Sequence, residues 1–345
     1  MKKLGLIFVV ALIVFNLNAQ EKKKYRIACI GFYNVENLFD TYHDAGKNDY
    51  EFLPDGSYQW TEERYQKKLE NISEVISKLG AKTVSAGPAI VGLSEIENRR
   101  VLEDLVAMPS IKDKNYQIVH YEGPDVRGVD VALIYQPSLF KVVSSRSVRL
   151  SIPSERGFFT RDQLLVSGTI DGEMIHVIVN HWPSRSSGEK RTSPLRCAAA
   201  DLTRSIVDSI LQTDADAKII VMGDLNDDPI NESIDKHLRA KGKQENLQQG
   251  DLFNPMYKMY KDGVGSLAYR DSWSLFDNLI VSQGLLGNDR SSYKLYQTKV
   301  FNENFLVQQS GAFKGYPWRT YAGGAYQGGY ADHFPVYLYI VKEAK

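Results

Sequence analysis

The feature that most constrains the fold of this chain is a recurring unit, in which an apolar, strand-like run stops at a polar residue. The unit is repeated along the chain, with its copies far apart in sequence. Its polar members are Asn34, Glu95, Asn180-His181 and Asp224-Leu225-Asn226, and Asp332-His333 stands just before the last apolar run. Two histidines with several acid and amide oxygens are typical of one metal-assisted hydrolytic site, which only the fold would assemble.

The apolar runs predict a mixed α/β protein. Residues 61–79 carry apolar side chains at helical spacing, with charges on the other side, which predicts an amphipathic helix lying on a sheet. A second long helix is expected over residues 195–211. Strands are expected at 25–33, 89–93, 117–121, 129–135, 164–170, 174–179, 218–222, 275–281, 295–301 and 336–340. Because the helices lie far apart, many neighbouring strands should be antiparallel.

No linker rich in Pro, Gly or Ser divides the chain, so we expect one domain over residues 20–345. The chain has 345 residues, 43% of them hydrophobic, which is enough for a well-buried core. Two segments, 241–271 and 310–330, have the composition of loops over a cleft. Loops of such length in a compact domain are usually functional.

The first residues have the pattern of a secretory signal peptide. Lys2-Lys3 precedes an apolar stretch from Leu4 to Phe15, which is too short to span a bilayer, and Ala19 is the expected residue before the cut. We therefore expect residues 1–19 to be a signal peptide and the mature chain to be exported, to the periplasm or the medium. No other segment is long and apolar enough to cross a membrane.

Charge and cysteine content narrow the function classes. The formal net charge is zero, so the chain has no overall basic character and nucleic acid is neither favoured nor excluded as a partner. No stable protein partner is implied. Only Cys29 and Cys197 are present, and two buried free thiols are favoured over a disulfide. A Gly-x-Ser-x-Gly elbow, a Walker loop and a Cys-x-x-Cys pair are absent from the sequence, which removes support for serine hydrolase, P-loop and zinc-finger interpretations.

Asp224 and Asn226 stand two residues apart at a strand end, so both side chains should project from the same face. One could be a carboxylate base and the other an amide that holds a phosphate oxygen or water. A plain turn is the alternative, since this composition favours turns.

Glu95 is a hard oxygen donor at the end of an apolar strand, where a divalent cation could bind. Asn34 and Asp332 could join it, and Glu97 shares its face and could compete for the role. Oxygen ligands without a Cys/His cluster select Mg²⁺, with Mn²⁺ or Ca²⁺ also possible, over zinc. A solvated residue at a strand end is the alternative for any single glutamate.

His181 and His333 each follow a polar residue beside a strand. In an extended segment Asp332 cannot point the same way as His333, which leaves each side chain free for a separate task. A carboxylate elsewhere would then orient His333, and Asp277 is the candidate. An imidazole held by an acid near a metal can stabilise a phosphorane-like transition state or donate to the leaving group, although either histidine alone is more often structural.

Three arginines are candidate phosphate clamps, because the guanidinium group matches phosphate geometry. Arg127 precedes Gly128, Arg161 lies in a Phe-Thr-Arg-Asp run, and Arg185 follows the strand end that carries His181. Surface salt bridges are the alternative for each of them. Arg319 lies in an aromatic loop that could contact bases, sugars or lipid, or could simply pack a lid.

The polar motifs follow one another in a set order. They are Asn34, Glu95, Arg-Gly-x-Asp at 127–130, Asn180-His181-Trp182-Pro183-Ser184-Arg185, Gly223-Asp224-Leu225-Asn226-Asp227, Asp277 and Asp332-His333. This ordered set resembles the endonuclease/exonuclease/phosphatase superfamily, also called DNase I-like, over residues 25–339. The resemblance implies a four-layered α/β sandwich, in which two mixed β-sheets face each other, helices lie outside, and strand-end loops form the active cleft.

The resemblance also implies a reaction and a division of roles. Family members cleave phosphodiester or phosphomonoester bonds with a divalent metal, usually magnesium. The roles implied are Glu95 as principal metal ligand with Asn34 and Asp332 near the metal, Asp224 and Asn226 positioning or activating water and phosphate, His333 oriented by Asp277, and His181 as the second histidine of DNase I-like and sphingomyelinase-like members.

The substrate follows less directly from the resemblance than the reaction does. The segments 241–271 and 310–330 match no specificity motif, and inositol-phosphatase signatures are not evident. We expect an exported, metal-dependent phosphoesterase that hydrolyses phosphodiester bonds, with nucleic acid as the first substrate. The alternatives are a phosphomonoesterase, a sphingomyelinase-like lipid phosphodiesterase, and a non-catalytic protein that binds phosphate ligands on the same scaffold.

Overall fold

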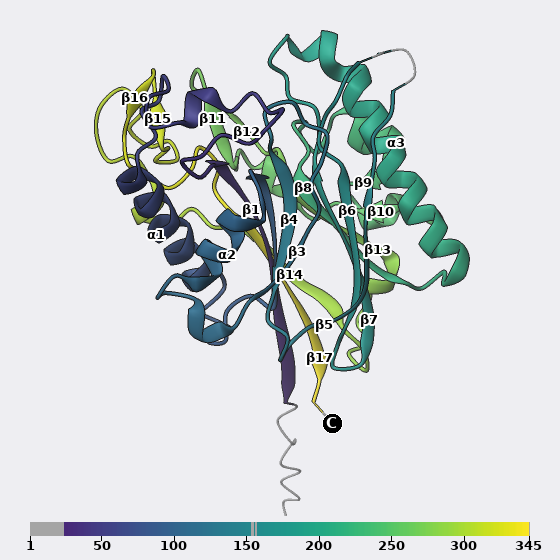
Figure 1. Cartoon of the computed structure of the whole chain (residues 1–345). Coiled ribbons are helices and arrows are strands. Elements are labelled where there is room, and N and C mark those ends of the chain that lie inside the picture. The colour runs from purple at the N-terminus through teal and green to yellow at the C-terminus, as the bar shows by residue number, and fades with distance from the viewer. Residues whose placement is uncertain (1–23, 153–154, 156, 345) are drawn as a thin grey trace, which may run out of the picture.

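Two large β-sheets form the centre of the protein (Figure 1). The computed structural model describes residues 24–152, 155 and 157–344. The first sheet has the order β14 (Lys294–Val300), β17 (Val336–Glu343), β1 (Tyr25–Leu38), β2 (Ile90–Ile96), β4 (Asp130–Tyr135), β3 (Gln117–His120). The second has the order β5 (Lys141–Val148), β6 (Gln163–Ile170), β7 (Glu173–His181), β8 (Lys218–Asp224), β13 (Asp277–Ser282), β10 (Leu252–Phe253), β9 (Ala240–Lys241).

The two sheets pack face to face through an apolar core that includes Phe32, Leu133, Val179 and Met222. At Gly92 in β2 the sheets approach so closely that an added Cβ would lie 2.5 Å from Met222 Sδ. Helices cover both outer faces: α1 (Glu62–Lys78) and α2 (Arg99–Ala107) on the first sheet, and α3 (Glu189–Thr213) on the second (Figure 1). The predicted four-layered α/β sandwich is therefore confirmed.

Helix α1 illustrates how local sequence selects an element. Thr61 caps its amino end by accepting a hydrogen bond from Arg64 N, and acidic residues fill the first turn, where they complement the helix dipole. Its apolar face, including Leu69 and Ile72, is buried against the first sheet. Burial of that face stabilises the helix more than propensity alone would.

The structure differs from the sequence-based expectation in several elements. Strand β5 was not expected, because it is an edge strand with mostly exposed polar residues. Helix α2 was also missed, although Asn98 caps it through a hydrogen bond from Val101 N. Helix α3 begins at Glu189 rather than near residue 195. The later start was expected because Pro194, which the helix contains, is a residue that usually interrupts a helix.

The two segments expected to be loops contain short regular elements. Residues 241–271 include β10, α4 (Met256–Lys261) and β11 (Leu267–Tyr269), which pairs with β12 (Ser272–Ser274). The segment 310–330 includes the hairpin of β15 (Tyr321–Ala322) and β16 (Ala325–Tyr326). The expectation of long loops was therefore too coarse, because elements of two to six residues leave little periodic pattern.

Both cysteines are free thiols, with Cys29 buried and Cys197 only partly buried. The expected signal peptide at 1–19 lies outside the described residues. Across the described part of the chain, no helix has the length and apolar character needed to cross a membrane.

Candidate active site

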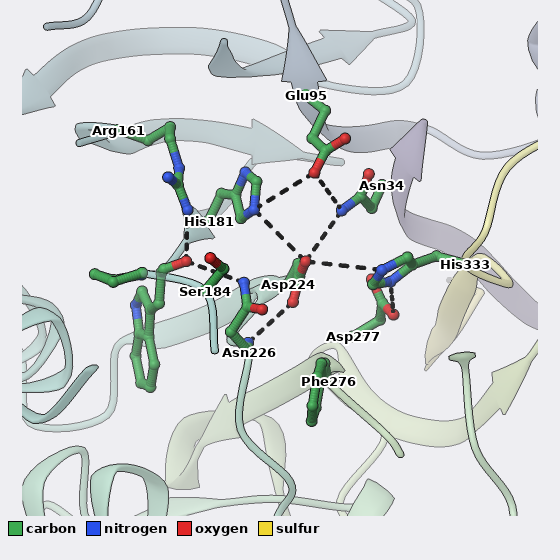
Figure 2. Close-up of polar contacts among 12 residues, drawn as sticks. Asn34, Glu95, Arg161, His181, Ser184, Asp224, Asn226, Phe276, Asp277 and His333 are labelled. Atoms are coloured by element: carbon green, nitrogen blue, oxygen red, sulfur yellow. Dashed lines mark hydrogen bonds and ion pairs between the residues drawn. The ribbon is translucent and has the colours of Figure 1, made fainter. Parts of the chain in front are cut away.

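The register of the strands brings the polar strand ends to one edge of the sandwich. In the second sheet His181 on β7 pairs with Asp224 on β8, and Asp224 pairs in turn with Asp277 on β13. In the first sheet Asn34 on β1 pairs with Ser94, next to Glu95 on β2. Figure 2 shows these side chains pointing toward one another from both sheets. Residues far apart in sequence are thus assembled by strand pairing.

Asn34 links the acids of the two sheets. Its Nδ2 donates to Asp224 Oδ2 at 3.0 Å and to Glu95 Oε1 at 3.4 Å. Glu95 has a φ of 64°, a left-handed conformation that is unfavourable for a glutamate and that turns its carboxylate off the strand. The backbone N–H of Asn37 donates to Glu95 Oε2 at 2.9 Å and holds it in place. Strand β1 continues past Asn34 to Leu38, rather than ending there as expected, with an irregular register after Asn34.

Glu97, the alternative to Glu95 as a metal ligand, accepts its hydrogen bond from the segment that follows β1. Its Oε2 accepts a hydrogen bond from the backbone N–H of Asp40 at 2.7 Å, and its Oε1 is buried with no hydrogen-bond partner among the described residues. The pKa of Glu97 is raised to about 9, chiefly by burial and also by the carboxylates of Asp40, Asp44 and Asp49, although the bond from Asp40 lowers it. Glu97 is therefore a neutral, structural carboxyl at neutral pH.

This pKa predicts a pH-dependent stability. The folded-state pKa lies above the unfolded value of about 4.3, so the stabilisation from Glu97 is complete below that value and is lost as pH rises toward about 9. Glu97→Gln copies the neutral form and does not titrate. Its free energy of unfolding relative to wild type should rise by up to about 1.4 kcal/mol per pH unit between pH 5 and 9, measured by urea denaturation. The exposed control Glu103→Gln should show no such trend, and parallel curves for both variants would contradict the assignment.

His181 lies between the two acids. Its Nε2 is 3.6 Å from Asp224 Oδ2 and 3.8 Å from Glu95 Oε1. Burial lowers the pKa of His181 well below its ordinary value, and the charges of Arg161 and Arg127 lower it further. A neutral imidazole adds no positive charge beside Asp224 and Glu95.

His333 is held by an acid and a hydroxyl. Its Nδ1 is 2.6 Å from Asp277 Oδ2, and Ser266 Oγ donates to the same oxygen at 2.5 Å. The contact between His333 and Asp277 predicted from the sequence therefore exists. Burial alone would lower the pKa of His333, but Asp277, Asp332 and Asp224 together raise it well above its ordinary value. The Nε2 edge of this cationic ring faces Asp224 Oδ2 at 4.0 Å (Figure 2).

Asp224 and Asn226 do not share the face of one extended strand, as expected. Strand β8 ends at Asp224, and Asn226 has a φ of 50°, so the chain turns and Asn226 N donates to Asp224 Oδ1 at 2.9 Å. The Asn226 amide donates to the carbonyl of Trp182 at 3.0 Å. Burial raises the pKa of Asp224 to about 7, with His333 lowering it and Asp277 raising it. The turn thus sets both residues at the site by a different geometry from the predicted one.

The three arginines differ in their surroundings. Arg161 is buried, and it donates to the carbonyl of Trp182 at 2.6 Å and to Asp125 at 3.2 Å. Arg185 donates to the carbonyl of Asn226 and to Asp227 behind the turn. Arg127 is half-exposed, 3.7 Å from Asp125. Among these three, Arg127 therefore has the guanidinium group most accessible to a substrate.

Asp332 lies at the rim of the site. Its Oδ1 is 3.9 Å from His333 Nε2, and its Oδ2 is 3.9 Å from Arg319. It is separated from Asn34 and Glu95 by more than a hydrogen-bond distance, since no contact joins them in the described structure. The carboxylate oxygens of Glu95, with Asn34 beside it and Asp332 at the rim, are hard donors of the kind that a divalent cation prefers.

Sequence reasoning missed several residues that shape the site. Asp125, Ser266 and the carbonyl of Trp182 hold Arg161, Asp277 and Asn226, respectively. Asp125 and Ser266 stand at no motif, and Trp182, which lies in the 180–185 motif, acts through its backbone carbonyl, so only the contacts identify these roles. Glu36 and Lys68, which are buried, were also missed. The signal in the sequence was a charged residue in the strand for Glu36 and one on the apolar face of the helix for Lys68.

The segments 241–271 and 310–330 meet beside His333. The hydroxyl of Tyr316 donates to Asp271 at 2.5 Å, and the rings of Tyr316 and Trp273 are 6.1 Å apart. Trp273 stacks in turn on Phe334, the residue after His333, with ring centroids 6.0 Å apart. Because Trp273 and Phe313 are also exposed, this aromatic wall presents ring faces to solvent next to the site.

Comparison with known proteins agrees with the fold. A model described as the Endonuclease/Exonuclease/phosphatase family matches residues 29–342. No curated protein sequence matches the chain.

Solved structures share the fold at low sequence identity. A functionally unknown conserved protein from Enterococcus faecalis V583 is 16% identical, with a TM-score of 0.55, over 91% of this chain and 100% of that one. The mannosyl-6-phosphatase of Bacteroides thetaiotaomicron VPI-5482 is 14% identical, with a TM-score of 0.53, over 91% and 99%. TDP2 of D. rerio, complexed with a single strand DNA product, is 13% identical, with a TM-score of 0.53, over 91% and 98%.

Proposed function

The chain belongs to the endonuclease/exonuclease/phosphatase family, and from this premise we propose that it is an exported hydrolase of phosphate esters that depends on a divalent metal ion. The observation that carries the proposal is the His333–Asp277 pair facing Asp224 across the edge where Asn34 and Glu95 also lie. A base, a cationic imidazole and hard oxygen donors within one small region are the groups that phosphoester hydrolysis requires.

Each side chain has a task that follows from its contacts. Asp224, whose pKa is raised to about 7, accepts a proton from the attacking water. His333, cationic and oriented by Asp277, stabilises the charge that develops on the phosphate oxygens. Asn34 fixes the spacing of Asp224 and Glu95 by donating to both.

We assign the cation to Glu95, with Asn34 and Asp332 beside it, and Mg²⁺ as the first ion. When bound, it supplies Lewis-acid stabilisation of the scissile phosphate. Arg127 contacts the substrate phosphate from its half-exposed position, while Arg161 and Arg185 act from behind by holding the carbonyls of Trp182 and Asn226.

The substrate that we favour is a nucleic-acid phosphodiester. Aromatic side chains exposed beside a phosphate site can stack on bases, each stacked base contributing about 1–3 kcal/mol. Trp273 and Phe313 occupy such positions.

A small phosphomonoester is the second candidate, favoured by the absence of excess positive charge and by the sugar-phosphatase neighbour. A lipid phosphodiester and a non-catalytic binding role are tested by the same experiments.

Chelation tests the metal requirement. Purified mature protein should lose hydrolysis of a bis-ester phosphate when treated with chelator and should recover it with Mg²⁺, because the carboxylates at the site need a cation to hold a phosphate beside them. The readout is product release with increasing Mg²⁺, Mn²⁺ or Ca²⁺. A protein that binds phosphate ligands but releases no product at any metal concentration would be a binder rather than a catalyst.

A substrate panel decides between the candidates. Plasmid DNA, RNA, sphingomyelin and sugar phosphomonoesters are compared under the same metal conditions, with His333→Ala and Asp224→Ala as inactive references. Activity on nucleic acid alone, lost in both variants, is the expected result. Full activity in both folded variants would refute the assignment of the site.

A further inference from the structure

A second cluster of ligating side chains lies on the hairpin of β3 and β4, on the strand beside the one that carries Glu95 (Figure 1). His120, Glu122 and Asp130 each offer an atom, and these atoms lie within 4.8 Å of one another. The proposed active site uses none of the three. His120 and Glu122 belong to none of the motifs, and Asp130, which ends the Arg-Gly-x-Asp run, has no role in the proposed reaction, so their convergence needs another explanation.

Strand register places two of the three on one face of the hairpin. His120 pairs with Ala132, so the two side chains project from the same side. Asp130 stands two residues before Ala132 on the same strand and therefore shares that side. The small Ala132 leaves room next to the imidazole. His120 Nε2 lies 3.4 Å from Asp130 Oδ2, and His120 Nδ1 lies 3.8 Å from Glu122 Oε1.

The imidazole of His120 is buried, and one of its nitrogens lacks a hydrogen-bond partner among the described residues. Its side chain is only 2% exposed, yet Nε2 makes no hydrogen bond with any described residue. A buried polar nitrogen without a partner costs free energy that native proteins avoid unless the group serves another purpose. The orphan atom points at a buried carboxylate, which already accepts a bond from Gly123 N at 3.1 Å.

The charge balance at the cluster also favours a cation. Lys47 is the nearby base, and its Nζ donates to the carbonyls of Gly123 and Asp125. Two carboxylates thus lie beside the His120 ring, while the ammonium group of Lys47 donates to carbonyls.

From this geometry we propose that His120, Glu122 and Asp130 bind a first-row transition-metal ion of the Zn²⁺ type, with water completing its coordination. One imidazole with two carboxylates suits Zn²⁺, Mn²⁺ or Co²⁺ rather than Mg²⁺, which prefers oxygen alone. Ligands at about 2.1 Å from a tetrahedral ion lie about 3.4 Å apart, and the 3.4 Å between His120 Nε2 and Asp130 Oδ2 matches this spacing. Glu122 is 59% exposed, so its carboxylate can rotate onto the ion.

The ion would close the loop between the two strands. That loop carries Asp125, which holds Arg161, and Arg127, the arginine accessible to substrate. Metal at this position therefore stabilises the segment that positions both guanidinium groups, and it is separate from the ion proposed at Glu95.

The test measures metal binding rather than activity. Chelator-treated full-length mature protein carrying Glu95→Gln, which weakens the proposed catalytic ion site, is titrated with Zn²⁺ by calorimetry and with Co²⁺ by visible absorption. One equivalent should bind. Adding His120→Asn should weaken Zn²⁺ binding about 100-fold or more, since a lost ligand exceeds the 10–100-fold cost of a lost supporting contact. Adding His237→Asn, at a histidine that pairs with Asp201 elsewhere, should change nothing.

Exposed Glu122→Gln is the second variant, because it leaves the buried residues intact and should fold. Zn²⁺ should raise the Tm of the Glu95→Gln protein, and Glu122→Gln should abolish that rise without lowering the Tm of the metal-free protein. Loss of all Zn²⁺ binding in Glu95→Gln alone would overturn the proposal. So would equal affinities in the His120→Asn and His237→Asn proteins.

Discussion

Asp277→Asn is expected to lower kcat about 10³-fold while leaving the fold intact. Asp277 Oδ2 accepts from His333 Nδ1 at 2.6 Å and from Ser266 Oγ, so the carboxylate fixes both the orientation and the charge of the imidazole. An amide has the same shape but removes the charge that raises the pKa of His333, and it favours the wrong tautomer. Kinetics with a bis-ester phosphate and Mg²⁺ measure the loss.

The pH profile distinguishes orientation from simple damage. In the variant the pKa of His333 falls, so the remaining activity should decline at lower pH than in the wild type as the imidazole loses its proton. Asp262→Asn, at an exposed acid that pairs only with Lys258, is the matched control and should keep wild-type kcat. If Asp277→Asn retains more than about a tenth of kcat while His333→Asn is inactive, Asp277 does not orient the ring.

Lys68→Met is expected to destabilise the protein by about 3–5 kcal/mol, the usual cost of removing one partner of a buried ion pair. Lys68 is 1% exposed, and its Nζ lies 3.8 Å from Glu36 Oε2. It also donates to Thr320 Oγ1 at 2.6 Å and to the carbonyl of Tyr330 at 2.7 Å. This one ammonium group therefore ties helix α1 and strand β1 to the segment 310–330.

The loss should depend on pH in a defined direction. The pKa of Glu36 is raised to about 7, chiefly by burial and also by Asp332, while Lys68 lowers it. Without Lys68 the pKa rises more, so the stabilisation from neutral Glu36 is complete below about pH 4.3 and is lost as pH rises through the folded value. Lys68→Met should therefore cost more at pH 8 than at pH 5, as measured by chemical denaturation.

Two further variants isolate the cause. Adding Glu36→Gln to Lys68→Met removes the unpaired charge and should recover part of the loss, which a double-mutant cycle measures. Lys67→Met, at the exposed neighbour on the same helix, should change stability by no more than about 0.5 kcal/mol. Equal losses at Lys67 and Lys68 would show that the buried contacts contribute nothing.

Much of the fold could be predicted from local patterns. Buried strands such as β2 and β8 contain continuous apolar runs, and α1 shows a clear helical period, so all three elements were anticipated. The exposed edge strand β5 was not, because it has few apolar residues. Helix α2 was missed although Val101, Leu102 and Leu105 follow a helical period, because the helix has only nine residues. The contact between Asp277 and His333 was anticipated as a requirement of the chemistry, and the structure contains it.

The sequence by itself determined that polar side chains stand where apolar strands stop, because alternation and apolar runs are local properties of the chain. The tertiary structure alone decided how those side chains meet. It turned Asn226 toward the carbonyl of Trp182, sent Glu97 away from the site, and joined Ser266 to Asp277. Such contacts depend on strand register and on packing between distant segments, which no local pattern encodes.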